Sequence, residues 1–159
     1  MQEILDILEQ DALATPEKIS QMVKLPVEEV RRRVRQLEED KIIVGYKTII
    51  DDDKADRKLV KALIEVKITP ERDGGFNRLA ARIAKYDEVK TCYLMSGGYD
   101  LLVIVEGTDL KQVATFVSEK LATINGVLST ATHFMLKAYK EQGTLYKLEQ
   151  FEERLKVSP

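Results

Sequence analysis

Residues 59–69 read Leu-Val-Lys-Ala-Leu-Ile-Glu-Val-Lys-Ile-Thr, and this stretch decides the fold. Its side chains alternate with a period of two, which is typical of a strand with one buried face. Val60, Ala62, Ile64, Val66 and Ile68 point to one side, and Lys61, Glu65 and Lys67 point to the other. Because the fifty residues before it follow the helical period instead, we expect a domain border just ahead of this strand.

The residues that follow predict a βαββαβ order. A helical face built on Phe76, Leu79, Ala80 and Ile83 precedes apolar strands at 89–95 and 99–106. A second helix, capped by Thr108 or Asp109, has Leu110, Val113, Ala114, Val117 and Leu121 on its inner face, and a strand follows at 127–140. This order predicts the ferredoxin-like module of an α+β protein, with two helices on one face of an antiparallel sheet.

One predicted strand is apolar at every position. Residues 101–105 read Leu-Leu-Val-Ile-Val, which is expected of a strand covered on both faces. Since both helices of the module lie on a single face, the simplest cover for the other face is a second subunit.

The first fifty residues predict a winged helix-turn-helix. One helix is built on Ile4, Leu5, Ile7 and Leu8, and a second starts at Thr15-Pro16 and buries Ile19, Met22 and Val23. A third helix opens at Pro26 and carries an apolar stripe of Val27, Val30, Val34 and Leu37. Residues 41–50 are rich in β-branched side chains around Gly45, which predicts a short hairpin, or wing.

The domain borders follow from these patterns. We expect a DNA-binding domain over residues 1–50, a linker over 51–58, a βαββαβ domain over 59–140, and a tail over 141–159. The tail has Leu148, Phe151 and Leu155 at helical spacing, which predicts a final helix.

Composition excludes several functions. The chain has 159 residues, 44% of them hydrophobic and 33% charged, with a net charge of −2. Cys92 and His133 are the only residues of their kinds, so we expect no disulfide, no clustered metal site and no cofactor. No motif indicates an enzyme. The sequence also has neither a signal peptide nor an apolar run long enough to cross a bilayer, which predicts a cytoplasmic protein.

The third helix is the first candidate site. Arg31, Arg32, Arg33 and Arg35 lie opposite the apolar stripe and can reach DNA phosphates and guanine edges. The alternative is an ordinary solvated face balanced by nearby glutamates. The winged helix-turn-helix order favours DNA binding, and it adds Val27 and Glu28 because the first turn of a recognition helix faces the groove. For Glu28 and Glu29 we favour stabilisation of the helix dipole over contact with cytosine.

The second candidate is residues 94–102, Leu-Met-Ser-Gly-Gly-Tyr-Asp-Leu-Leu. A glycine pair suits a two-residue hairpin turn, and most such turns bind nothing. Alternatively, the exposed backbone amides hold a carboxylate while Asp100 accepts from an ammonium group, which together would match an amino acid. The residues alone leave both interpretations open.

At this point the chain resembles the Lrp/AsnC, or feast/famine, family of transcription factors. The resemblance rests on four stretches, 4–8, 30–38, 43–46 and 95–100, and covers nearly all of residues 1–140. It implies a regulator that binds double-stranded DNA, forms homodimers that assemble further, commonly to octamers, and responds to an amino acid or related metabolite bound between subunits. The implied effector residues are Ser96, Gly97, Gly98, Tyr99 and Asp100, with Thr130 and Thr132 on the last strand.

Two departures from the family pattern concern these sites. Gly98 stands where many members have an acidic residue, and Pro26 stands where many have a serine cap. Two other functions stay open beside regulation. A sensing module that acts on a protein partner would keep its activity without residues 1–58, and an architectural DNA-binding protein would ignore small ligands.

Overall fold

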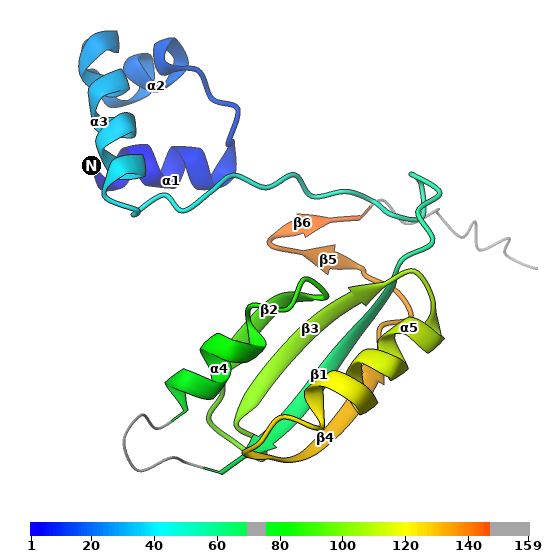
Figure 1. The fold of residues 1–159 in the computed structure, drawn as a ribbon. Helices are drawn as coiled ribbons and strands as arrows, with labels where there is room; N and C mark the ends of the chain where they lie inside the picture. The colour runs from blue at the N-terminus through cyan, green and yellow to red at the C-terminus, as the bar shows by residue number, and fades with distance from the viewer. Residues whose placement is uncertain (70–75, 147–159) are drawn as a thin grey trace, which may run out of the picture. The chain divides into compact units, whose positions relative to one another are not determined.

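The computed structural model describes residues 1–69 and 76–146. The chain divides into two compact units, Met1–Ile49 and Ile50–Pro159, each with its own apolar core. Figure 1 labels the elements of both units.

The first unit contains three helices: α1 (Gln2–Gln10), α2 (Pro16–Val23) and α3 (Val27–Glu39). The predicted start of α2 is confirmed, since the Thr15 hydroxyl accepts from the Lys18 amide at 3.3 Å and Pro16 opens the helix. The core consists of Ile4, Ala14, Ile19, Val30 and Leu37. Met22, predicted to be buried, is 57% exposed. It lies one position before Val23, whose side chain already packs on this core.

A short turn joins α2 to α3. Lys24 ends α2 in the left-handed conformation, with φ of 54°. The Leu25 amide then donates to the Ser20 carbonyl at 3.3 Å, and the Ser20 hydroxyl donates to the Leu25 carbonyl. These bonds satisfy backbone groups at the end of α2 and place Pro26 at the start of α3, which completes the predicted helix-turn-helix.

The predicted wing is wrong in this structure, because residues 41–50 form no strand and no hairpin. The backbone of Gly45 does not adopt the positive φ that a tight turn requires. An isolated two-stranded hairpin is also only marginally stable in water. The segment is held instead by Ile43, which packs on the core, and by the Tyr46 hydroxyl, which donates to Glu38 at 2.9 Å.

The second unit is built on a four-stranded antiparallel sheet in the order β2-β3-β1-β4. The strands are β1 (Val60–Ile68), β2 (Val89–Leu94), β3 (Leu101–Gly107) and β4 (Val127–Phe134). The helices α4 (Asn77–Ile83) and α5 (Leu110–Thr115) cover one face of this sheet (Figure 1). The predicted ferredoxin-like module is therefore confirmed.

The inner face of the second helix of the module differs from the prediction. After α5 the chain continues as a single π-helical segment, η1 (Phe116–Leu121), in which the Ala122 amide donates to the Val117 carbonyl at 2.8 Å. The wider turn allows Phe116 and Leu121, five residues apart, to share the face toward the sheet. Val113, Phe116 and Leu121 are buried, whereas Leu110 is 59% exposed and Ala114 is also exposed.

The chain after β4 also differs. The predicted strand at 127–140 ends at Phe134, and a two-stranded hairpin follows, β5 (Lys140–Glu141) and β6 (Thr144–Leu145). Gln142 and Gly143 both have positive φ, 44° and 83°, as a two-residue hairpin turn requires. The start of the predicted helical tail is thus a hairpin. Its proposed apolar positions, Leu148, Phe151 and Leu155, lie outside the described residues.

Candidate functional site

Helix α3 has one buried side and one charged side. Val30 and Leu37 are fully buried, and Val27 and Val34 are half-buried, as the predicted stripe requires. On the other side Arg31, Arg32 and Arg35 are exposed, Glu28 is exposed, and Arg33 is half-buried. The helix is thus fixed by one face and offers the guanidinium groups on the other.

Most of the α3 arginines form ion pairs with glutamates. Arg31 contacts Glu17 of α2 and, at 3.6 Å, Glu28. Arg32 and Arg33 both bond Glu29, at 2.8 and 2.7 Å. Hydrogen bonds from Arg32 and then Arg33 lower the pKa of Glu29 to about 2. The side chain of Arg35 makes no ion pair or hydrogen bond within the described residues.

The glycine loop is longer than the two-residue turn predicted for it. Six residues separate Leu94 at the end of β2 from Leu101 at the start of β3. The Met95 amide donates to the Asp100 carbonyl at 2.8 Å and closes the loop. Of the two glycines only Gly97 has a positive φ, 152°.

The loop presents backbone donors to solvent. Ser96, Gly97 and Gly98 are exposed, and within the described residues the amides of Gly97 and Gly98 have no hydrogen-bond acceptor. Tyr99 and Asp100 are half-buried. One Asp100 oxygen, Oδ2, accepts the Ile68 amide at 2.8 Å, so this side chain serves the fold as well as the loop.

Thr130 and Thr132, the threonines predicted to help bind the effector, lie on β4, in the sheet whose strands β2 and β3 the glycine loop connects. The Asp100 amide donates to the Val66 carbonyl, and Thr130 of β4 pairs with Val66 from the other side. Thr130 therefore lies one strand away from the glycine loop. Thr132 pairs with Ile64, two residues farther along, so the structure brings it less close.

One face of the sheet is uncovered by the described helices. Leu63, Leu102 and Ile104 share this face and are half-buried, and Tyr93 beside them is 58% exposed. Across strands β1 and β4 the His133 Nε2 atom lies 3.3 Å from Glu65 on the same face. This apolar face is the one that the sequence of β3 predicted to need cover.

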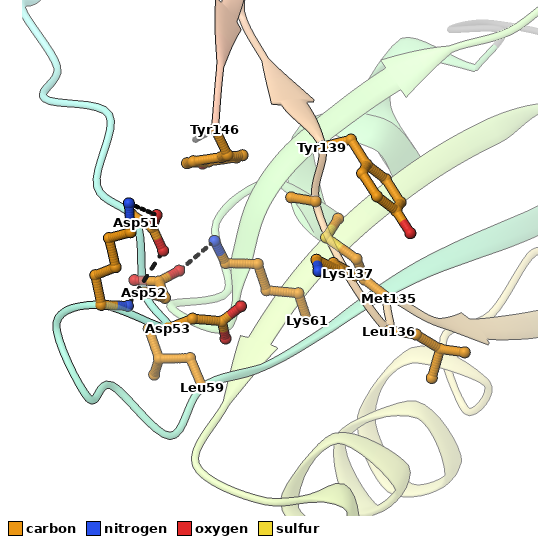
Figure 2. A pocket seen from close by; sticks show the side chains of 12 residues that line it. Asp51, Asp52, Asp53, Leu59, Lys61, Met135, Leu136, Lys137, Tyr139 and Tyr146 are labelled. Carbon is orange, nitrogen blue, oxygen red and sulfur yellow. Dashed lines mark hydrogen bonds and ion pairs between the residues drawn. The ribbon is translucent and has the colours of Figure 1, made fainter. Parts of the chain in front are cut away.

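A cavity of about 720 Å³ lies within the second unit, and sequence reasoning did not find it. Figure 2 shows it between residues 51–54, the start of β1 and the chain after β4. The Lys61 ammonium lies 2.7 Å from Asp52 and 3.8 Å from Glu106. The Tyr146 hydroxyl donates to Glu141 at 2.7 Å, which raises the pKa of Tyr146.

The ammonium group of Lys61 is compensated by carboxylates around this cavity. Burial by itself lowers the pKa of Lys61, but the hydrogen bond and charge of Asp52, with the charges of Glu141 and Glu106, raise it overall. Pairing between residues nine apart gave no sequence signal, because neither a helical nor a strand period brings positions 52 and 61 together.

Cys92 is half-buried in β2, and His133 lies on the uncovered face of the sheet. Burial raises the pKa of the Cys92 thiol, which packs near the Ala80 carbonyl at 3.9 Å. In the described part of the chain, no three His, Cys, Asp or Glu side chains are grouped to hold a metal ion. No described helix has the length and apolar character needed to cross a bilayer.

The helix-turn-helix with its arginine-bearing helix and the separate βαββαβ module define a class, the two-domain DNA-binding transcriptional regulators. Two family models match this chain: the AsnC-type helix-turn-helix domain over residues 2–38 and the Lrp/AsnC ligand binding domain over residues 61–145. The chain therefore belongs to the Lrp/AsnC family. This confirms the resemblance, and it agrees with the expectation of a regulator and not an enzyme.

Relatives match over almost their whole length. The HTH-type transcriptional regulator YugG of Bacillus subtilis is 44% identical over 99% of this chain and 95% of its own. The leucine-responsive regulatory protein of Salmonella typhimurium is 26% identical over 89% of this chain and 86% of its own. A crystal structure of a transcriptional regulator from Neisseria meningitidis in complex with L-Met superposes with a TM-score of 0.68. It is 29% identical and covers 87% of this chain and 89% of that one.

Proposed function

We propose that this regulator binds double-stranded DNA through the charged face of α3, with Arg31, Arg32, Arg33 and Arg35 as the contacting cations and Val27 and Glu28 at the groove end of the helix. The observation that carries the proposal is the division of α3 into a buried side and an arginine side. Val30 and Leu37 fix the helix on its own unit, which leaves Arg32 and Arg35 exposed. Arginine is suited to this role because its fork bonds phosphates and guanine edges.

The working form of the protein is a homodimer that assembles further, with the octamer as the expected end state. Support comes from the half-buried residues Leu63, Leu102 and Ile104 on the uncovered face of the sheet. A second copy would bury these side chains against its own equivalent face. Two α3 helices related by a twofold axis favour half-sites about 10 base pairs apart, or a multiple of that spacing.

The effector is an amino acid or a related small metabolite, held by residues 96–100 with help from Thr130 and Thr132. The unpaired amides of Gly97 and Gly98 can bind a carboxylate. Within the described residues Asp100 Oδ1 accepts no hydrogen bond, so it is available to an ammonium group while Oδ2 holds Ile68. A relative solved with L-Met supports this ligand class. We place the protein in the cytoplasm, where such a regulator meets both DNA and metabolites.

Selection of DNA from a random pool by the full-length protein tests the DNA-binding role. The expected product is a set of roughly palindromic sites with half-sites in phase with the DNA helix. Recovery of no enriched sequence would contradict a sequence-specific regulator.

Thermal unfolding with the twenty amino acids, one at a time, tests the effector. A ligand present at 100 times its dissociation constant stabilises the folded state by about 2.7 kcal/mol, which shifts the midpoint measurably. If no amino acid shifts it, the effector proposal fails while the DNA result stands.

A further inference from the structure

The Glu29 carboxylate accepts hydrogen bonds from two of the four arginines on α3. Its two carboxylate oxygens accept from Nε and Nη2 of Arg32 at 3.0 and 2.8 Å, and Oε1 also accepts from Nε of Arg33 at 2.7 Å. The side chain of Glu29 is only 27% exposed, compared with 67% for Arg32. The carboxylate therefore lies on the helix surface and draws the two guanidinium groups onto it.

The bonds to Arg32 use the part of the side chain that DNA would use. The Nε and Nη2 groups form one of the two edges through which a guanidinium binds a phosphate or a guanine edge with two parallel hydrogen bonds. While Nε and Nη2 of Arg32 are hydrogen-bonded to Glu29, a phosphate can bind to them only by displacing the carboxylate. The exchange replaces one anionic partner of Arg32, the carboxylate, with another, the phosphate. A phosphate contact alone therefore adds little to the stability of the complex.

The neighbouring charges are not arranged in this way. Glu28, the preceding residue, is 89% exposed and approaches Arg31 only to 3.6 Å. Arg35 has no partner within the described residues. Glu29 therefore bonds both Arg32 and Arg33, whereas the adjacent Glu28 bonds neither of them.

We propose that Glu29 is a specificity-determining residue whose carboxylate competes with DNA phosphate for Arg32 and Arg33. Binding to non-cognate DNA depends almost entirely on phosphate contacts and is the state that this competition weakens. At a matched site, contacts to base edges hold the helix in the groove, and the arginines can leave Glu29 for DNA. The inference rests on the proposed role of α3 in DNA binding and adds how that helix rejects other sequences.

The test compares Glu29→Gln with the matched control Glu28→Gln in the full-length protein. Both variants remove one negative charge from the first turn of α3, but only the first removes the hydrogen-bonded carboxylate. Fluorescence anisotropy would measure binding to a labelled duplex selected by the wild-type protein and to a shuffled duplex of the same composition. Each titration is repeated between about 50 and 200 mM KCl.

Removing the Glu29 carboxylate should strengthen binding to the shuffled duplex more than binding to the selected duplex. Two released arginines can each take up a phosphate, so the plot of log affinity against log salt should become steeper by roughly one to two units. At the lowest salt, affinity for the shuffled duplex should rise about tenfold, and the ratio of selected to shuffled affinity should fall by a similar factor. Glu28→Gln frees neither Arg32 nor Arg33, so it should change the slope less than Glu29→Gln does.

Three results would overturn the inference, the first two from the single glutamate variants. Equal effects of Glu29→Gln and Glu28→Gln would mean that only net charge matters, and weaker binding of both duplexes by Glu29→Gln would mean that Glu29 positions the arginines for DNA. A third arm uses Arg32→Lys, which cannot form the fork, so Glu29→Gln should have a smaller effect in that background. An undiminished effect there would also reject the proposal.

The same titrations separate this inference from the function on which it rests. If the wild-type protein binds neither duplex, the DNA-binding role of α3 fails, and the role of Glu29 fails with it. If the wild-type protein prefers the selected duplex and Glu29→Gln behaves as Glu28→Gln does, only the role of Glu29 is rejected.

Discussion

The Asp100 carboxylate accepts a hydrogen bond from the backbone N–H of Ile68 at 2.8 Å. This bond joins the end of the glycine loop to the end of β1, where Ile68 is buried. An N–H group at a buried residue needs an acceptor, because water cannot readily replace it. The loop proposed to bind the effector is therefore held by the same side chain that is proposed to contact the ligand.

Asp100→Ala and Asp100→Asn should separate these two roles. The alanine variant leaves the Ile68 N–H without its acceptor and should lower the free energy of unfolding by about 1–3 kcal/mol. The asparagine variant keeps an acceptor oxygen and should lose less, while removing the charge that an ammonium group needs. Urea unfolding measures the first effect, and the thermal shift given by the effector measures the second. Equal stability losses in both variants would contradict the structural role.

The Lys61 and Asp52 pair provides a second test, on stability. Lys61→Met removes the ammonium group from among Asp52, Glu106 and Glu141 but keeps the aliphatic chain. We expect a loss of about 1–2 kcal/mol in the free energy of unfolding at pH 7, between the values of exposed and buried pairs. Lys58→Met is the control, since Lys58 is exposed and makes no ion pair within the described residues.

The pH dependence of that loss follows from the sign of the shift. The folded-state pKa of Lys61 is raised above the ordinary value of 10.5. The stabilisation is therefore complete below pH 10.5 and disappears as pH rises through the folded-state pKa. Urea unfolding at pH 7 and at a strongly alkaline pH should show a difference between wild type and Lys61→Met that shrinks at the alkaline end. A constant difference would mean that packing, and not charge, stabilises this position.

The fold was predictable where a local period determined it. Strand β1 alternates along its whole length, and the α3 stripe of Val30 and Leu37 is buried as predicted. The prediction failed where long-range or local backbone geometry decides the outcome. Leu110 and Ala114, predicted to face the sheet, are exposed, and the expected wing did not form from residues 41–50.

The candidate sites were predictable as residue types but not as contacts. Sequence indicated the α3 arginines and suggested that Glu29 serves the helix dipole. It could not show that one carboxylate bonds both Arg32 and Arg33, because several partners were equally close along the helix. Asp100 was likewise identified as a ligand-binding group, whereas its bond to Ile68, 32 residues away, depends on strand register.

The open face of the sheet leads to a prediction about assembly. Ile104→Lys places a charge beside Leu63 and Leu102 on the face that a second copy is proposed to cover. Burying an unpaired charge there would be strongly unfavourable, so the variant should sediment as a monomer in analytical ultracentrifugation. Leu110→Lys is the matched control, since Leu110 is 59% exposed on α5. A dimer that survives Ile104→Lys would place the subunit interface elsewhere.

The charged face of α3 provides the most direct test of DNA binding. Arg32→Ala combined with Arg35→Ala removes two cations from exposed positions and leaves Val30 and Leu37 in the core, so the oligomer should be intact. Mobility shifts on the selected duplex should disappear. Any residual binding should show a salt slope reduced by roughly two units, about one for each lost phosphate contact.

A control must separate the position of these charges from their number. Arg82→Ala combined with Lys85→Ala removes the same charge from exposed positions in and just after α4, in the other unit. Since the net charge of the chain is only −2, attraction to DNA must come from a local patch, and this control should bind the duplex like wild type. If both double variants weaken binding equally, the long-range charge of the protein, and not the α3 surface, carries the interaction. Unchanged mobility shifts for Arg32→Ala with Arg35→Ala would remove α3 from the DNA interface.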